Sequence, residues 1–106
     1  MRAIHHPDIK DVVLSRVLYA LSDPVRLGVV RQLAQEGEAT CSALDGGRPK
    51  SSMSHHFRVL REAGLVRTRT DGPAHMNELR RQDIEARFPG LLQAVLSAPP
   101  EAGEAG

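Results

Sequence analysis

The chain of 106 residues contains little cysteine and no long hydrophobic run, and each absence excludes a class of protein. Its one cysteine, Cys41, rules out an intramolecular disulfide framework. No apolar run approaches the roughly 18 residues that span a bilayer. The first residues also lack the continuous apolar stretch of a secretory signal. We therefore expect a cytoplasmic protein without a membrane segment.

Common catalytic motifs are missing as well. The sequence has no phosphate-binding glycine loop, no nucleophile elbow and no His-Glu-x-x-His pair. Ser54 and His55 are neighbours, but adjacent residues of a helix do not face each other. We expect no enzymatic activity.

The length of the chain fits one domain with a modest core. We expect residues 8–97 to form that domain, preceded by a flexible arm over residues 1–7. Residues 98–106 read "APPEAGEAG". This stretch is too rich in Pro, Gly and Ala to fold, so we expect a disordered tail.

The net charge of +1 hides a basic region. Between Arg48 and Arg81, eight Lys or Arg side chains stand against three acids, and three histidines lie in the same stretch. The resulting excess of five positive charges is typical of a protein that binds a polyanion such as nucleic acid. A solvated charged face is the alternative.

The first half of the chain contains three predicted helices. The first spans about residues 8–21 and has an apolar side wider than one packing partner needs. The second is capped by Ser22 or Asp23 and ends at Gly37. A short third helix covers residues 40–44 and is followed by the turn-forming sequence Asp-Gly-Gly.

The last predicted helix spans about residues 81–97, and Pro89 should kink it or divide it into two pieces. Its apolar stripe has no obvious partner left within so small a domain. Together with the wide apolar side of residues 8–21, this stripe indicates a subunit interface built from both ends of the chain. Packing within the core is the alternative.

Residues 50–63 form the most informative predicted helix, with Gly64 as its stop signal. Because His56 turns inward, we expect it to be a hydrogen-bonded structural histidine. The other inward positions are apolar: Met53, Phe57, Leu60 and Ala63. The outward positions carry polar or basic side chains and a single acid: Ser51, Ser54, His55, Arg58 and Glu62.

A hairpin follows this helix. The sequence "LVRTRT" alternates apolar or β-branched residues with arginine, "DGPA" turns the chain, and "HMNELR" runs back. These features predict a β-hairpin with its tip at residues 71–74. Three helices followed by a hairpin describe a winged helix-turn-helix, a mainly α fold in which the helix before the hairpin enters the DNA major groove.

The outward face of residues 50–63 has the chemistry that this role requires. Short polar side chains let the backbone approach base edges, and cations reach phosphate or a guanine edge. An ordinary surface helix is the alternative, but Glu62 alone opposes the cations. The hairpin arginines could also serve as charges that protect an exposed strand edge. The residues that we expect to contact DNA are Lys50, Ser51, Ser52, Ser54, His55, Arg58, Arg67 and Arg69.

Two stretches, "ALSDPVRLGVVRQLA" at residues 20–34 and "KSSMSHHFRVLREAGLVRTRTDG" at residues 50–72, resemble the ArsR/SmtB family of bacterial transcriptional repressors. The resemblance covers nearly the whole chain, from residue 6 to about residue 96. It implies a homodimer, formed through the first and last helices, that binds a palindromic double-stranded operator. It also implies release or modulation by a small-molecule or metal effector. The alternative function is a winged-helix adaptor that binds a protein and has no specific DNA site.

The resemblance also directs attention to metal ligands. The family's thiolate site uses a Cys-x-Cys pair, whereas Cys41 stands alone here, as a packing residue or as a thiol that responds to oxidation. The family's site on the last helix uses Asp and His pairs. Asp83 and Glu85 match the acidic half of this site, but the last predicted helix contains no histidine. His5 and His6 could join Asp83, Glu85 or Cys41 of a partner subunit to bind zinc or nickel as an effector.

Overall fold

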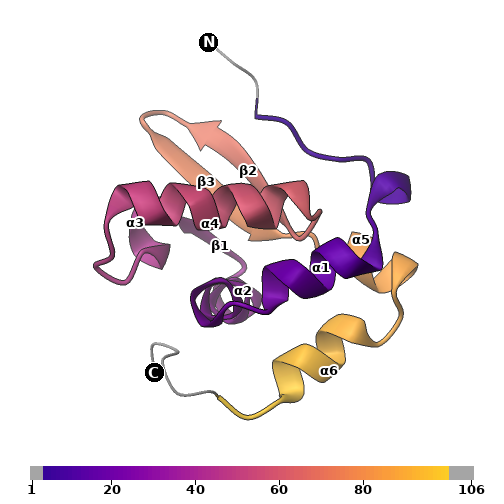
Figure 1. Cartoon of the computed structure of the whole chain (residues 1–106). Helices are drawn as coiled ribbons and strands as arrows, with labels where there is room; N and C mark the ends of the chain where they lie inside the picture. The colour runs from indigo at the N-terminus through magenta and orange to yellow at the C-terminus, as the bar shows by residue number, and fades with distance from the viewer. Residues whose placement is uncertain (1–3, 101–106) are drawn as a thin grey trace.

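The computed structural model describes residues 4–100, which form a mainly helical winged helix-turn-helix with a small three-stranded antiparallel sheet. Strands β2 and β3 form a hairpin, the wing, whose turn lies at the opposite end of the molecule from α6 (Figure 1). The elements in chain order are the 3-10 helix η1 (Ile9–Asp11), α1 (Leu14–Leu21), α2 (Pro24–Glu36), β1 (Glu38–Thr40), α3 (Cys41–Leu44), α4 (Lys50–Glu62), β2 (Val66–Asp71), β3 (Ala74–Leu79), α5 (Arg81–Arg87) and α6 (Leu91–Ser97).

The sheet has the strand order β1-β3-β2, and both neighbours of β3 run antiparallel to it. The predicted hairpin with its turn at residues 71–74 is confirmed. The structure adds a third strand that the sequence pattern did not predict, β1, in which Ala39 lies opposite Asn77. Buried Asn77 joins all three strands. Its Oδ1 accepts a hydrogen bond from the Thr68 hydroxyl at 2.6 Å, and its Nδ2 donates to the Ala39 carbonyl at 3.3 Å.

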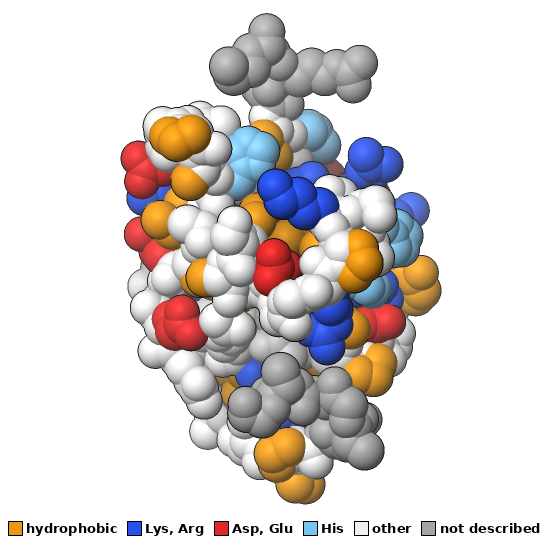
Figure 2. Space-filling view, turned by 90° about the vertical axis from the view of Figure 1, so that its left-hand side faces the viewer, with side chains coloured by type: hydrophobic (Ala, Val, Ile, Leu, Met, Phe, Trp, Pro, Cys, Tyr) orange, Lys and Arg blue, Asp and Glu red, His pale blue; other side chains and the backbone are white. Residues whose placement is uncertain are grey.

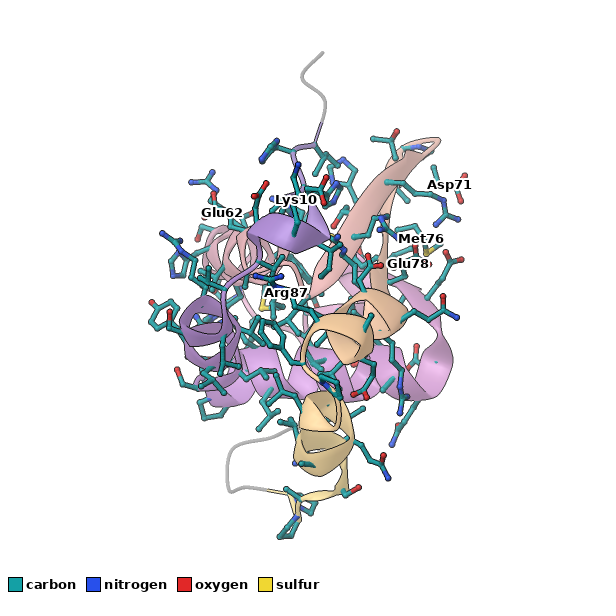
Figure 3. All side chains as sticks on the ribbon, turned by 90° about the vertical axis from the view of Figure 1, so that its right-hand side faces the viewer. Lys10, Glu62, Asp71, Met76, Glu78 and Arg87 are labelled. Carbon is teal, nitrogen blue, oxygen red and sulfur yellow. The ribbon has the colours of Figure 1, made fainter. Side chains whose placement is uncertain are left out.

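The first helix begins later than the sequence predicts. Instead of a helix over residues 8–21, α1 starts at Leu14, and Val12 before it is extended. Contacts from distant parts of the chain hold this extension. The Val12 side chain packs directly against Gly64, and the Val12 carbonyl accepts a hydrogen bond from Arg87 Nε, 2.5 Å away. Figure 3 shows Arg87 between α5 and the segment that leads into α1.

Capping residues set both ends of α2 and the start of α3, and α4 ends next to its predicted glycine stop. Two backbone amides at the start of α2 donate hydrogen bonds to the Asp23 carboxylate, and Gly37 ends that helix with a φ of +85°. The Thr40 hydroxyl caps α3. Helix α4 covers Lys50–Glu62, within one residue of its predicted end. Local capping chemistry therefore sets most of the helix boundaries in this part of the fold, except the uncapped start of α4.

The last predicted helix is divided at Pro89, one of the two outcomes that the sequence predicts. Gly90 has a φ of +84° and leads into α6. The Glu85 carboxylate accepts hydrogen bonds from the amides of Gly90 and Leu92, at 3.1 and 3.2 Å, and so stabilises the turn between α5 and α6.

The ends of the chain are described only in part. Residues 98–100 have no regular secondary structure, whereas residues 1–3 and 101–106 lie outside the described residues. The flexible arm over residues 1–7 and the disordered tail over residues 98–106 therefore stay predictions. Among residues 4–100, no helix is both long and apolar enough to span a membrane.

One hydrophobic core joins the helices to the sheet. Helix α4 buries Met53, Phe57 and Leu60 in it, and Ile84 of α5 and Leu92 of α6 are fully buried in the same core. A fully buried apolar side chain of this size contributes about 1.5–3 kcal/mol. The inner face of α4 is therefore fixed to the domain, which leaves the opposite face of the helix to the solvent.

Substitution of two glycines tests this packing. Gly64 has a φ of +88° and a Cβ there would overlap the Val12 side chain, so Gly64→Ala should lower the free energy of unfolding by more than about 1 kcal/mol. Gly28 lies inside α2, and a Cβ added there would have no heavy atom within 4 Å. Gly28→Ala should therefore raise the free energy of unfolding by about 0.5–1 kcal/mol. Urea denaturation measures both changes. Equal stability of Gly64→Ala and wild type would contradict the packing of Val12.

Candidate nucleic-acid interface

The outward face of α4 is a continuous polar and basic surface. Its side chains are exposed where the sequence predicts: Lys50, Ser51, Ser52, Ser54, His55 and Arg58. Within residues 4–100, no ion pair includes Lys50 or Arg58. In Figure 2 most Lys, Arg and His side chains lie on the right half of the face shown. This half corresponds to the front of the molecule in Figure 1, where α4 lies. The positive charge of α4 is therefore available to an external anion.

The start of α4 offers backbone donors as well. Pro49 precedes the helix, and no side chain among the described residues caps its first turn. The Ser52 hydroxyl donates instead to the Pro49 carbonyl at 3.0 Å. Unsatisfied amides and the positive end of the helix dipole favour a phosphate group at this position. Lys50, on the first turn, adds a full charge to the same end.

The inward histidine of α4 is held as predicted. His56 is half-buried, and its Nδ1 lies 3.3 Å from Nη1 of Arg26 on α2. His55, its exposed neighbour, has its ring centroid 5.7 Å from that of His56. The two adjacent histidines therefore have separate roles, one toward the domain and one toward the solvent.

The wing arginines are exposed, but they are already paired. Arg67 lies 3.4 Å from Glu78 and 3.3 Å from Asp83, and Arg69 lies 2.7 Å from Glu38. The hydrogen bond and charge of Glu38 raise the pKa of Arg69 above its ordinary value. The sequence did not reveal these pairs, because the acids come from β1, β3 and α5. Exposed pairs are weak, so a phosphate can compete for either arginine.

The candidate metal ligands make separate contacts within the domain. His6 Nε2 accepts a hydrogen bond from the Thr68 amide at 2.9 Å, and burial, reinforced by the charge of Arg80, lowers the pKa of His6. Asp83 pairs with Arg80 at 3.0 Å, and Glu85 binds the turn before α6. In the described part of the chain, no group of three or more His, Cys, Asp or Glu side chains is placed to hold a metal ion. His5, His6, Cys41, Asp83 and Glu85 all lie in this part of the chain.

Cys41 is a half-buried thiol at the start of α3. Its Sγ lies 3.3 Å from Nδ2 of Asn77, the buried side chain that joins the strands. It also lines a cavity of about 260 Å³ between α3, α4 and the turn of the wing. These contacts fit the packing role among the alternatives for this cysteine.

Two cations are buried that the sequence pattern did not predict to be so. Arg26 and Arg80 are only 4% and 6% exposed. Arg80 donates a hydrogen bond from Nη1 to the Pro7 carbonyl at 2.8 Å and ties the N-terminal segment to α5. Hydropathy gives no signal for such residues, since each is buried through hydrogen bonds to carbonyl groups, to which Arg80 adds its pair with Asp83.

Known proteins share this fold and much of this sequence. The helix-turn-helix domain family matches residues 21–69, from the end of α1 into β2. YceK of Bacillus subtilis, an uncharacterized HTH-type transcriptional regulator, is 33% identical over 88 residues, which cover 80% of this chain and 88% of YceK. An arsenical resistance operon repressor of Staphylococcus xylosus is 33% identical over 73 residues, which cover 68% of this chain and 70% of the repressor.

A solved structure agrees with these relatives. The homodimeric winged helix-turn-helix DNA-binding domain Mb0332 of Mycobacterium bovis matches with a TM-score of 0.64 and 31% identity, over 77% of this chain and 76% of that domain. The exposed basic helix, the wing and the relatives lead to one conclusion. The chain belongs to the ArsR family of HTH-type transcriptional regulators, which bind DNA and are not enzymes, as the resemblance in its sequence predicted.

Proposed function

We propose that this regulator is a homodimeric repressor that binds a palindromic operator with two copies of α4. The observation that carries the proposal is the outward face of α4, where Lys50 and Arg58 lie without an internal ion-pair partner among residues 4–100. In a two-fold dimer the two helices enter successive major grooves roughly 34–36 Å apart. The operator is then an inverted repeat with that spacing between half-sites.

The residues of α4 divide between base and phosphate contacts. Ser51, Ser54 and His55 are short enough to hydrogen-bond base edges when the helix backbone lies in the groove. Arg58 reaches a guanine edge or a phosphate, and Lys50 with the uncapped first turn binds the phosphate at the start of the helix. Ser52 lies beside this phosphate and contributes a hydroxyl already bonded to the chain.

The wing makes a secondary contribution. The side chains of Arg67 and Arg69 are 48% and 52% exposed, so DNA can reach them. Each must exchange a carboxylate partner for phosphate, and the gain in affinity is the difference between the two interactions. Arg67 and Arg69 therefore contribute less affinity than Arg58.

The dimer surface that we propose begins with α1. Large apolar side chains on and before this helix are between 44% and 59% exposed, which is unusual for side chains on one short helix. Helix α6 adds partly buried apolar side chains from the other end of the chain. The related domain of Mycobacterium bovis is a homodimer, which supports the same assembly here. The residues on and before α1 are Val13, Leu14, Leu18 and Tyr19, and those of α6 are Leu91, Val95 and Leu96.

An effector completes the proposal. The candidate ligands of one chain do not converge in the described residues, so a zinc or nickel effector would have to be held between two subunits. A small molecule is the other class of effector. In either case the effector releases the operator by changing how the two α4 helices are spaced.

Arg58→Ala tests the DNA face. Loss of this unpaired cation should weaken binding to DNA from upstream of the gene by about tenfold and reduce the slope of log affinity against log salt by about one. Arg67→Ala should weaken binding by a smaller factor. Fluorescence anisotropy over a range of salt concentrations measures both quantities. Arg81→Ala, an exposed arginine of α5, is the matched control and should leave affinity unchanged.

Two results of this titration would contradict the proposal. Equal losses for Arg58→Ala and Arg81→Ala would mean that the affinity comes from total charge and not from α4. Absence of specific, salt-dependent binding by the wild type would favour the protein-binding adaptor instead.

Leu18→Glu tests the dimer surface. A carboxylate placed on this apolar face would be buried against the partner subunit, so the dimer dissociation constant should rise at least about a hundredfold. Analytical ultracentrifugation measures the change, and operator affinity should fall with it. Gln35→Glu adds the same charge on the exposed side of α2 and should remain a dimer. A fully dimeric Leu18→Glu variant would place the interface elsewhere.

A further inference from the structure

We infer that Arg26 is a positioning residue for DNA binding, which fixes the recognition helix α4 to the end of α1 through a contact that only neutral His56 can make. The inference rests on the proposed function, because it concerns how α4 is presented to the operator. It adds a residue of α2 that is not part of the DNA-contacting face.

The burial of Arg26 is the first observation. This side chain is 4% exposed although it carries a permanent charge. Its Nε donates a hydrogen bond to the Ala20 carbonyl at 2.8 Å, and its Nη2 donates to the Tyr19 carbonyl at 3.1 Å. Carbonyls in the last turn of a helix lack the usual amide partner four residues on. The Tyr19 carbonyl also accepts from the Ser22 amide and hydroxyl, and Arg26 adds donors to it and to the Ala20 carbonyl. Arg26 is therefore held at the end of α1 in one orientation.

The remaining donor of the same guanidinium points at α4. Nη1 of Arg26 lies 3.3 Å from Nδ1 of His56. Because an arginine only donates, Nδ1 must be the acceptor, and the imidazole proton must be on Nε2. A second proton on His56 would turn Nδ1 into a donor that faces a fixed cation. The contact therefore exists only with the neutral ring.

Arg26 also reaches the proposed dimer surface. Its Cζ lies 5.0 Å from the centre of the Tyr19 ring, a cation–π contact. Tyr19 is 59% exposed and belongs to the apolar face of α1. A partner subunit that covers Tyr19 would remove water from this contact and strengthen it. One side chain thus connects the subunit interface to the helix that reads DNA.

The charges around His56 determine the direction of its pH dependence. Burial lowers the pKa of His56 below its ordinary value, and the neighbouring charges of Arg26, His55 and Arg48 act in the same direction. Asp23 opposes them, but its carboxylate already accepts two backbone hydrogen bonds. The folded state thus binds this proton less readily than the unfolded chain. The stability that the contact provides is present above the ordinary histidine pKa and is lost as the pH falls below it.

His56→Asn separates the contact from the titration. An asparagine carbonyl can accept from Arg26 close to the position of Nδ1, but it does not gain a proton in this range. Operator affinity is measured by anisotropy from about pH 8 to about pH 5, and the ratio of wild-type to variant affinity is followed. Because other histidines protonate in both proteins, their effect cancels in this ratio. As the pH falls from about 8 to about 5, the ratio should fall by about tenfold, because only the wild type loses the contact with Arg26.

The matched control is His75→Asn, which removes an exposed histidine of β3 and should keep the wild-type pH profile. A constant ratio between wild type and His56→Asn would overturn the inference. NMR of His56 provides a second readout that needs no DNA. It should show the neutral ring protonated on Nε2, and a proton on Nδ1 would also overturn the inference. If the wild type binds no operator at about pH 8, the proposed function fails, and the NMR result still decides the contact.

Discussion

The burial of one face of α4 is the constraint on which the rest of the structure depends. Met53, Phe57 and Leu60 hold this helix in the hydrophobic core that it shares with the other helices and the sheet. Each of the three contributes about 1.5–3 kcal/mol through apolar burial. Since these three positions recur at helical spacing, the polar residues between them must face the solvent. The same packing that stabilises the domain therefore leaves exposed the polar and basic face of α4 that we propose reads DNA.

Charge is distributed unequally between the two parts of that surface. Lys50 and Arg58 of α4 form no ion pair among residues 4–100, whereas Arg67 and Arg69 of the wing are paired with carboxylates. In Figure 3 Glu78 lies near the base of the wing and Asp71 at its tip. We therefore propose that α4 supplies most of the affinity for DNA and that the wing adjusts it when its arginines exchange carboxylate for phosphate.

The helix-turn-helix part of the fold could be predicted because its signals are local. Asp23 and Gly37 mark the ends of α2 by capping chemistry, and the faces of α4 follow from spacing alone. Strand β1 could not be predicted, since three residues are too few to show alternation and their partners on β3 lie far along the chain. The late start of α1 and the burial of Arg26 likewise depend on distant contacts, with Gly64 and with His56.

An NMR titration of the isotope-labelled protein with DNA from upstream of its gene tests the role of α4 most directly. If α4 reads the operator, the largest amide shifts map to its outward positions, from Lys50 to Arg58, with smaller shifts at Arg67 and Arg69. Shifts of similar size spread over α2 and α5, with α4 unaffected, would contradict the claim that α4 reads the operator.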